Sequence, residues 1–341
     1  MNHPIRSGRA LMFGAALLAT GLASAADSFT LDLSGDADGG RGVLGGLGHG
    51  GETWSWHLDS AHSTAPALAV ERGEGAFESD SFSVGGGWTR GAWSIALDHD
   101  MWTDSSGTDS RTWGADLAWQ GEQWRVALEP RSGRVTTTLP APASPDLERR
   151  SFDRAAFGAS LEWRGERWSW WASAADWNYD PSLAGSGGQL VHELESLVDL
   201  QVLAGLIRRG QLALADQYLL NHGATGLRTV LQTEGLVGLA RVVRYQLRRV
   251  QYAASLHTFA LGLSDSAHRL GVERRFEAGA LSFEYERLTV PVDGLESDSY
   301  ALRWRWPLSA ALDLTLNAGW IETESFGTTT FAGLTLQYYL D

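Results

Sequence analysis

Apolar and polar residues alternate with a period of two along most of this chain. Trp93, Ile95 and Leu97 share one face of such a run, and a second run, starting at Leu312, alternates Leu, Ala and Trp with Asp, Thr, Asn and Gly. This period predicts β-strands with one apolar and one polar face. Short turns are expected around residues 50–51, 90–91, 121, 165, 209–210, 248–249, 278–279 and 307–311, and longer polar loops at 61–78, 103–109, 134–151, 179–196, 290–297 and 323–327.

Three of the glycine-containing turns have a tryptophan on both sides. The indole ring is apolar apart from one N–H group, so it suits the boundary between lipid and water. In a soluble β-sandwich, the alternative fold, the tryptophans would lie mostly inside. We therefore expect an all-β fold, a transmembrane up-and-down antiparallel β-barrel, with interface tryptophans formed by the pairs Trp88 and Trp93, Trp119 and Trp124, and Trp163 and Trp168.

The number of strands depends on a leucine-rich segment without tryptophan, residues 181–252. Residues 189–207 fit a helical pattern, but the alternation of Leu212, Leu214, Asp216 and Tyr218 favours strands from Leu197 onward. With strands there, we expect a barrel of about 16–18 strands. A helical insertion over residues 189–250 would instead leave about 14, and an even number keeps both termini on one side.

The N-terminal residues have the pattern of a secretory signal peptide. Arg6 and Arg9 precede an apolar run over residues 10–22, and Ala23-Ser24-Ala25 is a small-residue cleavage pattern. We expect residues 1–25 to be removed near Ala25 after Sec export, which leaves residues 26–341 as the barrel. The chain has no cysteine, so neither a disulfide nor a lipid-modified N-terminal cysteine is expected.

The C-terminal strand resembles that of bacterial outer-membrane β-barrel proteins. It runs from Gly333 to Tyr338 with apolar or aromatic residues at alternate positions, although Ala332 precedes the glycine and the chain ends in Leu340 and Asp341. The resemblance is porin-like in general architecture, covers residues 26–341 and identifies no subfamily. It implies a bacterial outer-membrane location, contact with membrane lipid and lipopolysaccharide, and recognition of the segment from Gly333 to Tyr338 by the barrel-assembly machinery. It implies no oligomeric state.

The face opposite the apolar residues is expected to line the lumen. A formal net charge of −14 argues against a nucleic-acid partner, and no cofactor is indicated. We expect Glu284 to lie opposite Arg303 on neighbouring strands. The expected inward set is Asp59, Asp98, Asp116, Arg125, Glu129, Glu162, Arg244, Arg269, Glu273, Glu284, Glu286, Arg303, Arg305 and Asp313.

Three functions fit this sequence. A polar lumen favours a water-filled channel for small hydrophilic solutes, and a structural or partner-binding envelope barrel is the alternative. A lipid-modifying enzyme is the third, because such barrels use a His and a Ser with an Asn or Glu. His57, Asp59 and the neighbours His62 and Ser63 come nearest to such a site, or to a metal site, but form no complete pattern. We therefore expect no enzyme activity, no catalytic residues and no metal ligands. Divalent cations bound by acidic loop residues remain a weaker alternative.

Overall fold

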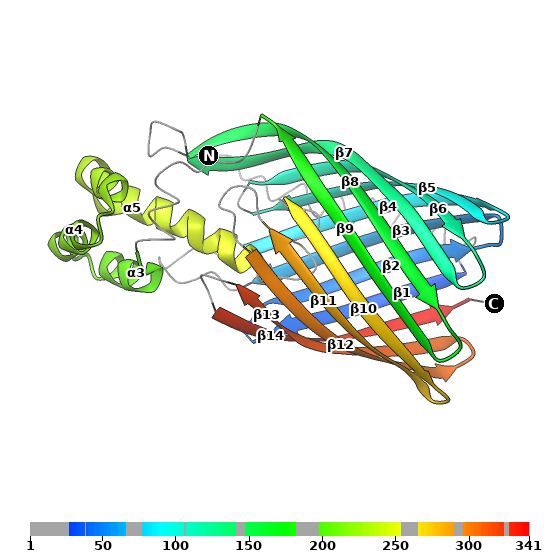
Figure 1. Cartoon of the computed structure of the whole chain (residues 1–341). Helices are drawn as coiled ribbons and strands as arrows, with labels where there is room; N and C mark the ends of the chain where they lie inside the picture. Colours follow the sequence, from blue (N-terminus) through cyan, green and yellow to red (C-terminus); the bar gives the residue numbers. More distant parts are fainter. Residues whose placement is uncertain are drawn as a thin grey trace.

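The computed structural model is a closed antiparallel β-barrel of fourteen strands with a helical unit at one mouth (Figure 1). It describes residues 27–37, 39–65, 77–105, 107–140, 147–181, 198–253, 265–289, 296–323 and 327–340. The strands are β1 (Ser28–Asp36), β2 (Arg41–Gly50), β3 (Trp54–Ala65), β4 (Phe77–Arg90), β5 (Trp93–Asp104), β6 (Asp109–Gln120), β7 (Trp124–Pro140), β8 (Leu147–Arg164), β9 (Trp168–Asp180), β10 (Ser266–Phe276), β11 (Gly279–Thr289), β12 (Glu296–Ser309), β13 (Leu312–Thr323) and β14 (Gly327–Tyr339). The expected signal peptide lies outside the described residues.

The barrel closes because the first strand pairs with the last. β1 and β14 form a continuous antiparallel ladder from Ser28 opposite Tyr339 to Asp36 opposite Phe331. Every other strand pairs with its neighbours in the sequence, so the sheet has no free edge. The expected up-and-down antiparallel β-barrel is confirmed. The preferred count of 16–18 strands was wrong, and the count of 14 that we expected for a helical insertion is correct.

The two ends of the barrel differ in their connections. At one end, which we call the turn end, short turns at residues 51–53, 91–92, 121–123, 165–167, 277–278 and 310–311 join the strands. The opposite end, the loop end, has the longer connections and the helical unit. Turns were expected at all six of these places, but the residues of the other two expected turns, 209–210 and 248–249, lie in the helical unit instead. The expected loop at 134–151 is shorter than predicted at both ends, because β7 runs to Pro140 and β8 starts at Leu147.

Side chains alternate between an apolar outer face and a polar inner face. On β5, the outer residues Trp93, Ile95 and Leu97 are 64%, 45% and 60% exposed, whereas Asp98 and the alternate residues point inward. Neighbouring strands pair outward residues with outward residues, since Trp93 lies opposite Trp119 and Ile95 opposite Leu117. This is the polarity of a barrel whose outside meets an apolar medium.

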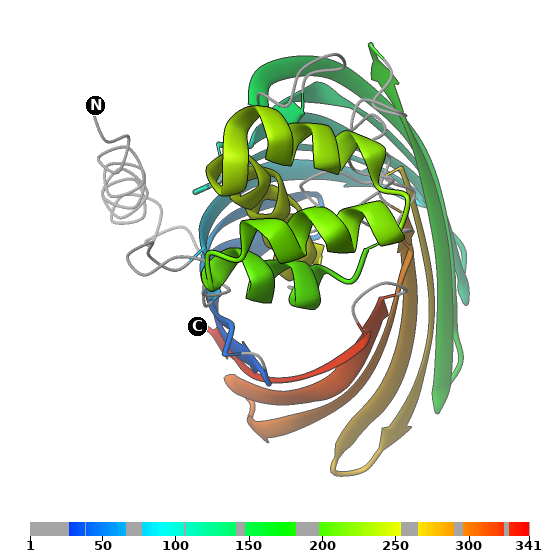
Figure 2. The same ribbon diagram turned by 90° about the vertical axis from the view of Figure 1, so that its left-hand side faces the viewer.

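The helical unit consists of α3 (Leu200–Arg208), α4 (Leu212–Asn221) and α5 (Thr225–Ala253), and it stands over the loop-end mouth (Figure 2). The preference for strands here was wrong. On α4 the buried residues are Ala215 and Leu219, which are four positions apart as one helix face requires. Leu, Ala and Gln are strong helix formers, and their propensity outweighs a short accidental alternation.

Glycine ends the first helix of this unit. The expected hairpin turn around Gly210 is a helix–helix turn, in which Gly210 has a φ of 66° and donates its N–H to Ile207 O at 3.0 Å. α5 bends at Gly235, which has a φ of 68°. None of the described helices is long and apolar enough to cross a membrane.

The helical unit has its own apolar core and its own ion pair. Leu203, Leu219 and Leu227 are fully buried in this core. Arg228 binds Asp216 through two N–H···O bonds of 2.8 and 3.2 Å. These bonds hold the pKa of Asp216 below its usual value. The pair therefore stabilises the unit at neutral pH, and its contribution is lost as the pH falls through the lowered pKa.

Candidate functional site

The inner wall of the barrel carries the charged side chains that the sequence analysis placed in the lumen. The register and the burial pattern put Asp98, Asp116, Arg125, Glu129, Glu284, Glu286, Arg303 and Arg305 on the inward face. Asp59, Glu162, Arg269, Glu273 and Asp313 also point inward. The prediction that Arg244 lines the lumen was wrong, because this residue lies in helix α5 and not on a strand.

Arginines and aspartates occupy different parts of this wall. Among the described strand residues, the inward arginines all lie on β7 to β12: Arg125, Arg131, Arg150, Arg154, Arg164, Arg269, Arg275, Arg303 and Arg305. The inward aspartates lie on β1 to β6 and on β13: Asp32, Asp36, Asp59, Asp98, Asp100, Asp104, Asp116 and Asp313. This segregation follows from the register and was not visible in the sequence, where both signs are scattered.

On the arginine-bearing wall, glutamates neutralise much of the positive charge. Arg269 Nε lies 2.6 Å from Glu286 Oε1, and Arg275 Nε lies 3.2 Å from Glu273 Oε1. Arg303 Nη2 lies 3.3 Å from Glu284 Oε1. The direct pairing expected for these last two was wrong, because Arg303 lies opposite Ser282 and Glu284 opposite Ala301. The long arginine side chain reaches the glutamate diagonally on the same face.

The aspartate-bearing wall retains negative charge. Arg125 Nη2 pairs with Asp116 at 2.8 Å where the two walls meet. Asp32, Asp59 and Asp313 have no arginine within ion-pair distance in the described part of the chain. Asp32 accepts a hydrogen bond from Thr335, and Asp313 accepts one from the Tyr339 hydroxyl at 3.4 Å. The inner surface is therefore more negative over β1, β3 and β13 than over β7 to β12.

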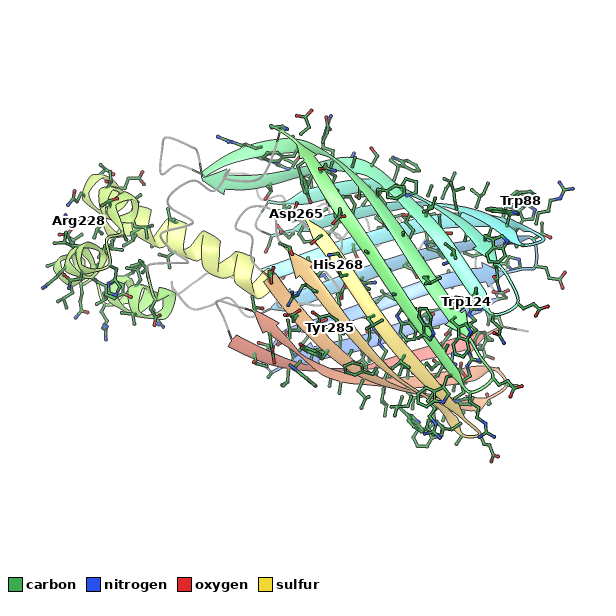
Figure 3. All side chains as sticks on the ribbon, viewed as in Figure 1. Trp88, Trp124, Arg228, Asp265, His268 and Tyr285 are labelled. Carbon is green, nitrogen blue, oxygen red and sulfur yellow. The ribbon has the colours of Figure 1, made fainter. Side chains whose placement is uncertain are left out.

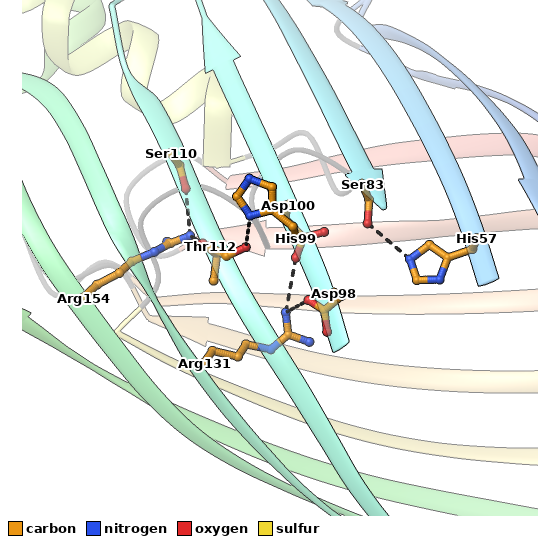
Figure 4. A network of polar contacts seen from close by, with 9 residues as sticks. All are labelled: His57, Ser83, Asp98, His99, Asp100, Ser110, Thr112, Arg131 and Arg154. Carbon is orange, nitrogen blue, oxygen red and sulfur yellow. Dashed lines mark hydrogen bonds and ion pairs between the residues drawn. The ribbon is translucent and has the colours of Figure 1, made fainter. Parts of the chain in front are cut away.

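A compact ionic cluster spans β5 and β7 on the inner wall (Figure 4). The Arg131 Nη1 atom lies 3.8 Å from Asp98 Oδ2 and 3.5 Å from Asp100 Oδ2. On the neighbouring strands, His57 Nε2 lies 3.4 Å from Ser83 Oγ. A single arginine therefore faces two carboxyl groups in this cluster.

At the loop end, part of the inner wall between β5 and β9 is packed instead of water-facing. Trp102 and Phe152 point inward but are only 1% exposed, and Val135 is fully buried. Arg154 donates hydrogen bonds to Ser110 Oγ and Thr112 Oγ1, and its guanidinium lies 4.5 Å from the centre of the Trp177 ring. This cluster was not predicted from the sequence, where the one available signal was an aromatic residue at an inward position of the alternation.

The geometry removes the nearest candidates for a catalytic or metal site. His62 lies on β3, not in a loop, and points outward to Asp80, with 2.9 Å between Nδ1 and Oδ1. Ser63 is the next residue on the same strand and points inward to Ser79. His62 therefore faces away from Ser63, and also from His57 and Asp59. Within the residues that the structure describes, no group of three His, Cys, Asp or Glu side chains is placed to hold a metal ion.

The six tryptophans expected at the interface all sit on the outer face at the turn end. Trp88 and Trp124 are visible there in Figure 3. Trp93 lies opposite Trp119, and Trp124 lies opposite Trp163. Trp168 is 47% exposed, and Arg274 stacks on it at 5.2 Å. The structure adds Trp54 to the same row, opposite Trp88 and 65% exposed.

No protein-family model and no curated protein matches this sequence. Several solved structures resemble the barrel at low sequence identity. The KdgM porin is 7% identical with a TM-score of 0.37, and the alignment covers 92% of this chain and 99% of the porin. The CymD monoaromatic hydrocarbon channel is 8% identical with a TM-score of 0.48, covering 92% and 87%. Pseudomonas putida OprB is 7% identical with a TM-score of 0.43, covering 94% and 95%.

Proposed function

We propose that this barrel lies in the bacterial outer membrane and is a water-filled channel for small hydrophilic solutes, with a preference for cations and without covalent chemistry. The observation that carries the proposal is the division of the wall into an apolar outer face and a charged inner face. An eight-stranded barrel is just wide enough for its side chains to fill the interior. Fourteen strands enclose a wider lumen, and ionisable side chains on its wall favour water inside.

Two features of the wall shape the expected pathway. The buried side chains between β5 and β9, including Trp102 and Phe152, narrow the lumen on that side near the loop end. The rest of the wall carries Asp32 on β1, Asp59 on β3 and Asp313 on β13 without an arginine partner among the described residues. A cation passing this side is attracted and an anion is repelled, which is the basis of the proposed preference.

Swelling of liposomes that contain the purified barrel tests permeation directly. We expect small neutral solutes to enter, and small cationic solutes to enter faster than anionic ones of similar size. Empty liposomes and liposomes with heat-denatured protein serve as controls. The absence of swelling with every solute would count against a channel.

Arg131 provides a residue-level test of selectivity. In Arg131→Gln, Asp98 and Asp100 lose the cation that faces them. The attraction between unit charges about 4 Å apart in water is about 1 kcal/mol, a factor of about five in occupancy. We therefore expect a severalfold higher cation-to-anion permeability ratio, measured from the reversal potential in a salt gradient.

Two variants control this experiment. Arg131→Lys keeps the charge and should keep most of the wild-type selectivity. Arg287→Gln removes an arginine that points to the outer face, where it pairs with Asp298 at 2.8 Å, and should leave selectivity unchanged. An equal change in Arg131→Gln and Arg287→Gln would show that the inner cluster does not set selectivity.

We also propose that the turn end faces the periplasm and the loop end faces the cell exterior. Arg208 and Arg209 are exposed at the end of α3, and Arg164 and Arg167 are exposed at a turn. Trypsin added to intact cells should therefore cut after Arg208 or Arg209 and spare residues 164–167, as peptide mapping would show. Cleavage at the turn alone would indicate the reverse orientation.

The segment from Gly333 to Tyr338 is proposed to contact the barrel-assembly machinery before the barrel closes. In the folded barrel it is paired on both sides, with Gly333 opposite Asn317 of β13 and Ser34 of β1. Its backbone groups are therefore available for strand addition only while β1 and β14 are apart.

A partner-binding barrel is the second candidate function. It is favoured by the helical unit, which has its own core and presents exposed apolar residues such as Val237 (70%) and Leu220 (54%). A barrel that assembles normally but gives neither swelling nor current would support this alternative. Lipid modification is less well supported, because His62 and Ser63 lie on opposite faces of the wall.

A further inference from the structure

Two arginines face each other on the outer surface of the barrel. Arg111 on β6 lies directly opposite Arg134 on β7 in the strand register, and both side chains are exposed. Trp113 and Trp119 follow on the same outward face of β6 and are 63% and 41% exposed. The two arginines, which we call the Arg111–Arg134 pair, therefore stand at the loop-end edge of the apolar surface.

The height of the pair matches the boundary of a lipid layer. It can be measured from the tryptophans at the turn end, Trp119 on β6 and Trp124 on β7. Strands rise about 3.3 Å per residue, and a tilt of about 40° reduces this to about 2.5 Å along the barrel axis. Arg111 and Arg134 thus stand about 20–25 Å above the tryptophans, and the apolar band of such barrels is about 25 Å tall.

The protein balances the charge of the pair only in part, because one carboxylate, that of Asp153, faces two arginines. Arg134 Nε binds Asp153 Oδ1 at 2.7 Å, and Arg149 Nη2 binds Asp109 Oδ2 at 2.6 Å. Arg111 faces Met101 on its other side and has no ion pair within the described ranges. Like charges directly opposite each other on neighbouring strands destabilise the sheet. An anion between Arg111 and Arg134 would offset this repulsion.

We propose that the Arg111–Arg134 pair binds the phosphate group of a membrane lipid, namely a phosphorylated glycolipid of the leaflet at the loop end. A guanidinium donates two parallel N–H bonds to phosphate oxygens, and two guanidinium groups side by side can hold one phosphate from both flanks. The apolar face below, with Trp113 exposed, would contact the acyl chains of the same lipid. This inference rests on the proposed membrane location but is independent of conduction.

The matched control for this site is Arg287. It also points outward near the loop end, but it lies 2.8 Å from Asp298 and 3.8 Å from Glu296, so two carboxylates face one arginine there. At the Arg111–Arg134 pair, one carboxylate faces two arginines. Arg287→Gln removes the same side chain from the same kind of position. A lipid effect that is specific to Arg111 and Arg134 should therefore be absent in Arg287→Gln.

The experiment measures lipid bound to the intact barrel by native mass spectrometry in detergent. The probes are lipid A with both phosphates, lipid A without phosphates, and inorganic phosphate. We expect wild type and Arg287→Gln to bind the phosphorylated lipid A equally, and the Arg111→Gln/Arg134→Gln double variant to bind it at least fivefold more weakly. Lipid A without phosphates should bind all three proteins alike.

Several results would overturn the proposal. Equal binding of phosphorylated lipid A by the double variant and the wild type would remove the pair from lipid recognition. Inorganic phosphate that binds as well as the lipid would indicate a free anion site. Heat-modifiable mobility on gels checks that the double variant is folded, and the more conservative Arg111→Lys variant should retain part of the binding. A barrel that binds lipid in this manner but carries no current would contradict the proposed channel and leave this inference intact.

Discussion

Replacing Phe283 by arginine should prevent the barrel from folding stably into a membrane. Phe283 lies near the middle of β11 on the outer face, opposite Val272 on β10 and Leu302 on β12, and is 41% exposed. An arginine on the lipid face near the midplane costs about 2–4 kcal/mol in such barrels. Urea titration of folding into lipid vesicles should show a loss of this size in the free energy of unfolding.

Ser282 is the matched control because it is the preceding residue and points inward. It lies opposite Glu273 on one side and Arg303 on the other, so an added arginine meets one charge of each sign. Ser282→Arg should fold with a loss well below that of Phe283→Arg, because its side chain is on the water-facing wall. If Ser282→Arg were the more harmful of the two, the inner and outer faces would have been assigned the wrong way round.

Truncating Leu219 to alanine should unfold the helical unit while the barrel stays closed. Leu219 is completely buried between the helices of this unit, and removing such a side chain costs about 2–5 kcal/mol. Unfolding of the helical unit should not open the barrel, because β9 and β10, the strands before and after the insertion, pair directly, with Asp176 opposite Ser266. Hydrogen exchange should rise over α3 and α4 and stay unchanged over β9 and β10.

Leu220 offers the control for this change. It follows Leu219 on α4 but is 54% exposed, so Leu220→Ala removes the same atoms from a solvent-facing position. Its exchange rates should match those of the wild type. A loss of protection in the strands of Leu219→Ala would mean that the helical unit is part of the barrel's stability and not a separately folded insertion.

The barrel was predictable from sequence because its constraints are local. A period of two and tryptophans beside tight turns are visible within a few residues, and they correctly indicated the strands around Trp93 and Trp119. The helical unit was harder to identify. Leu212, Leu214 and Tyr218 alternate by chance with smaller or polar residues, whereas the absence of tryptophan and the Leu and Ala content were the more reliable signals.

The candidate site was predictable only in part. Strand alternation gave the face on which Asp98 and Arg303 lie, since a side chain's face follows from its neighbours in sequence. It did not give contacts across strands, so Glu284 was expected opposite Arg303 and is displaced by two positions. The packed cluster around Trp102 depends on residues from β5 to β9, and only the closed fold brings them together.

Single-channel recording in planar lipid bilayers tests the central claim, that the barrel is an open cation-preferring pore. With a KCl gradient across the bilayer, we expect stepwise currents and a reversal potential displaced toward the equilibrium potential of potassium. This follows from the aspartates on β1, β3 and β13 that have no arginine partner in the described structure. Correctly folded protein that inserts but carries no current, or a reversal potential displaced toward that of chloride, would contradict it.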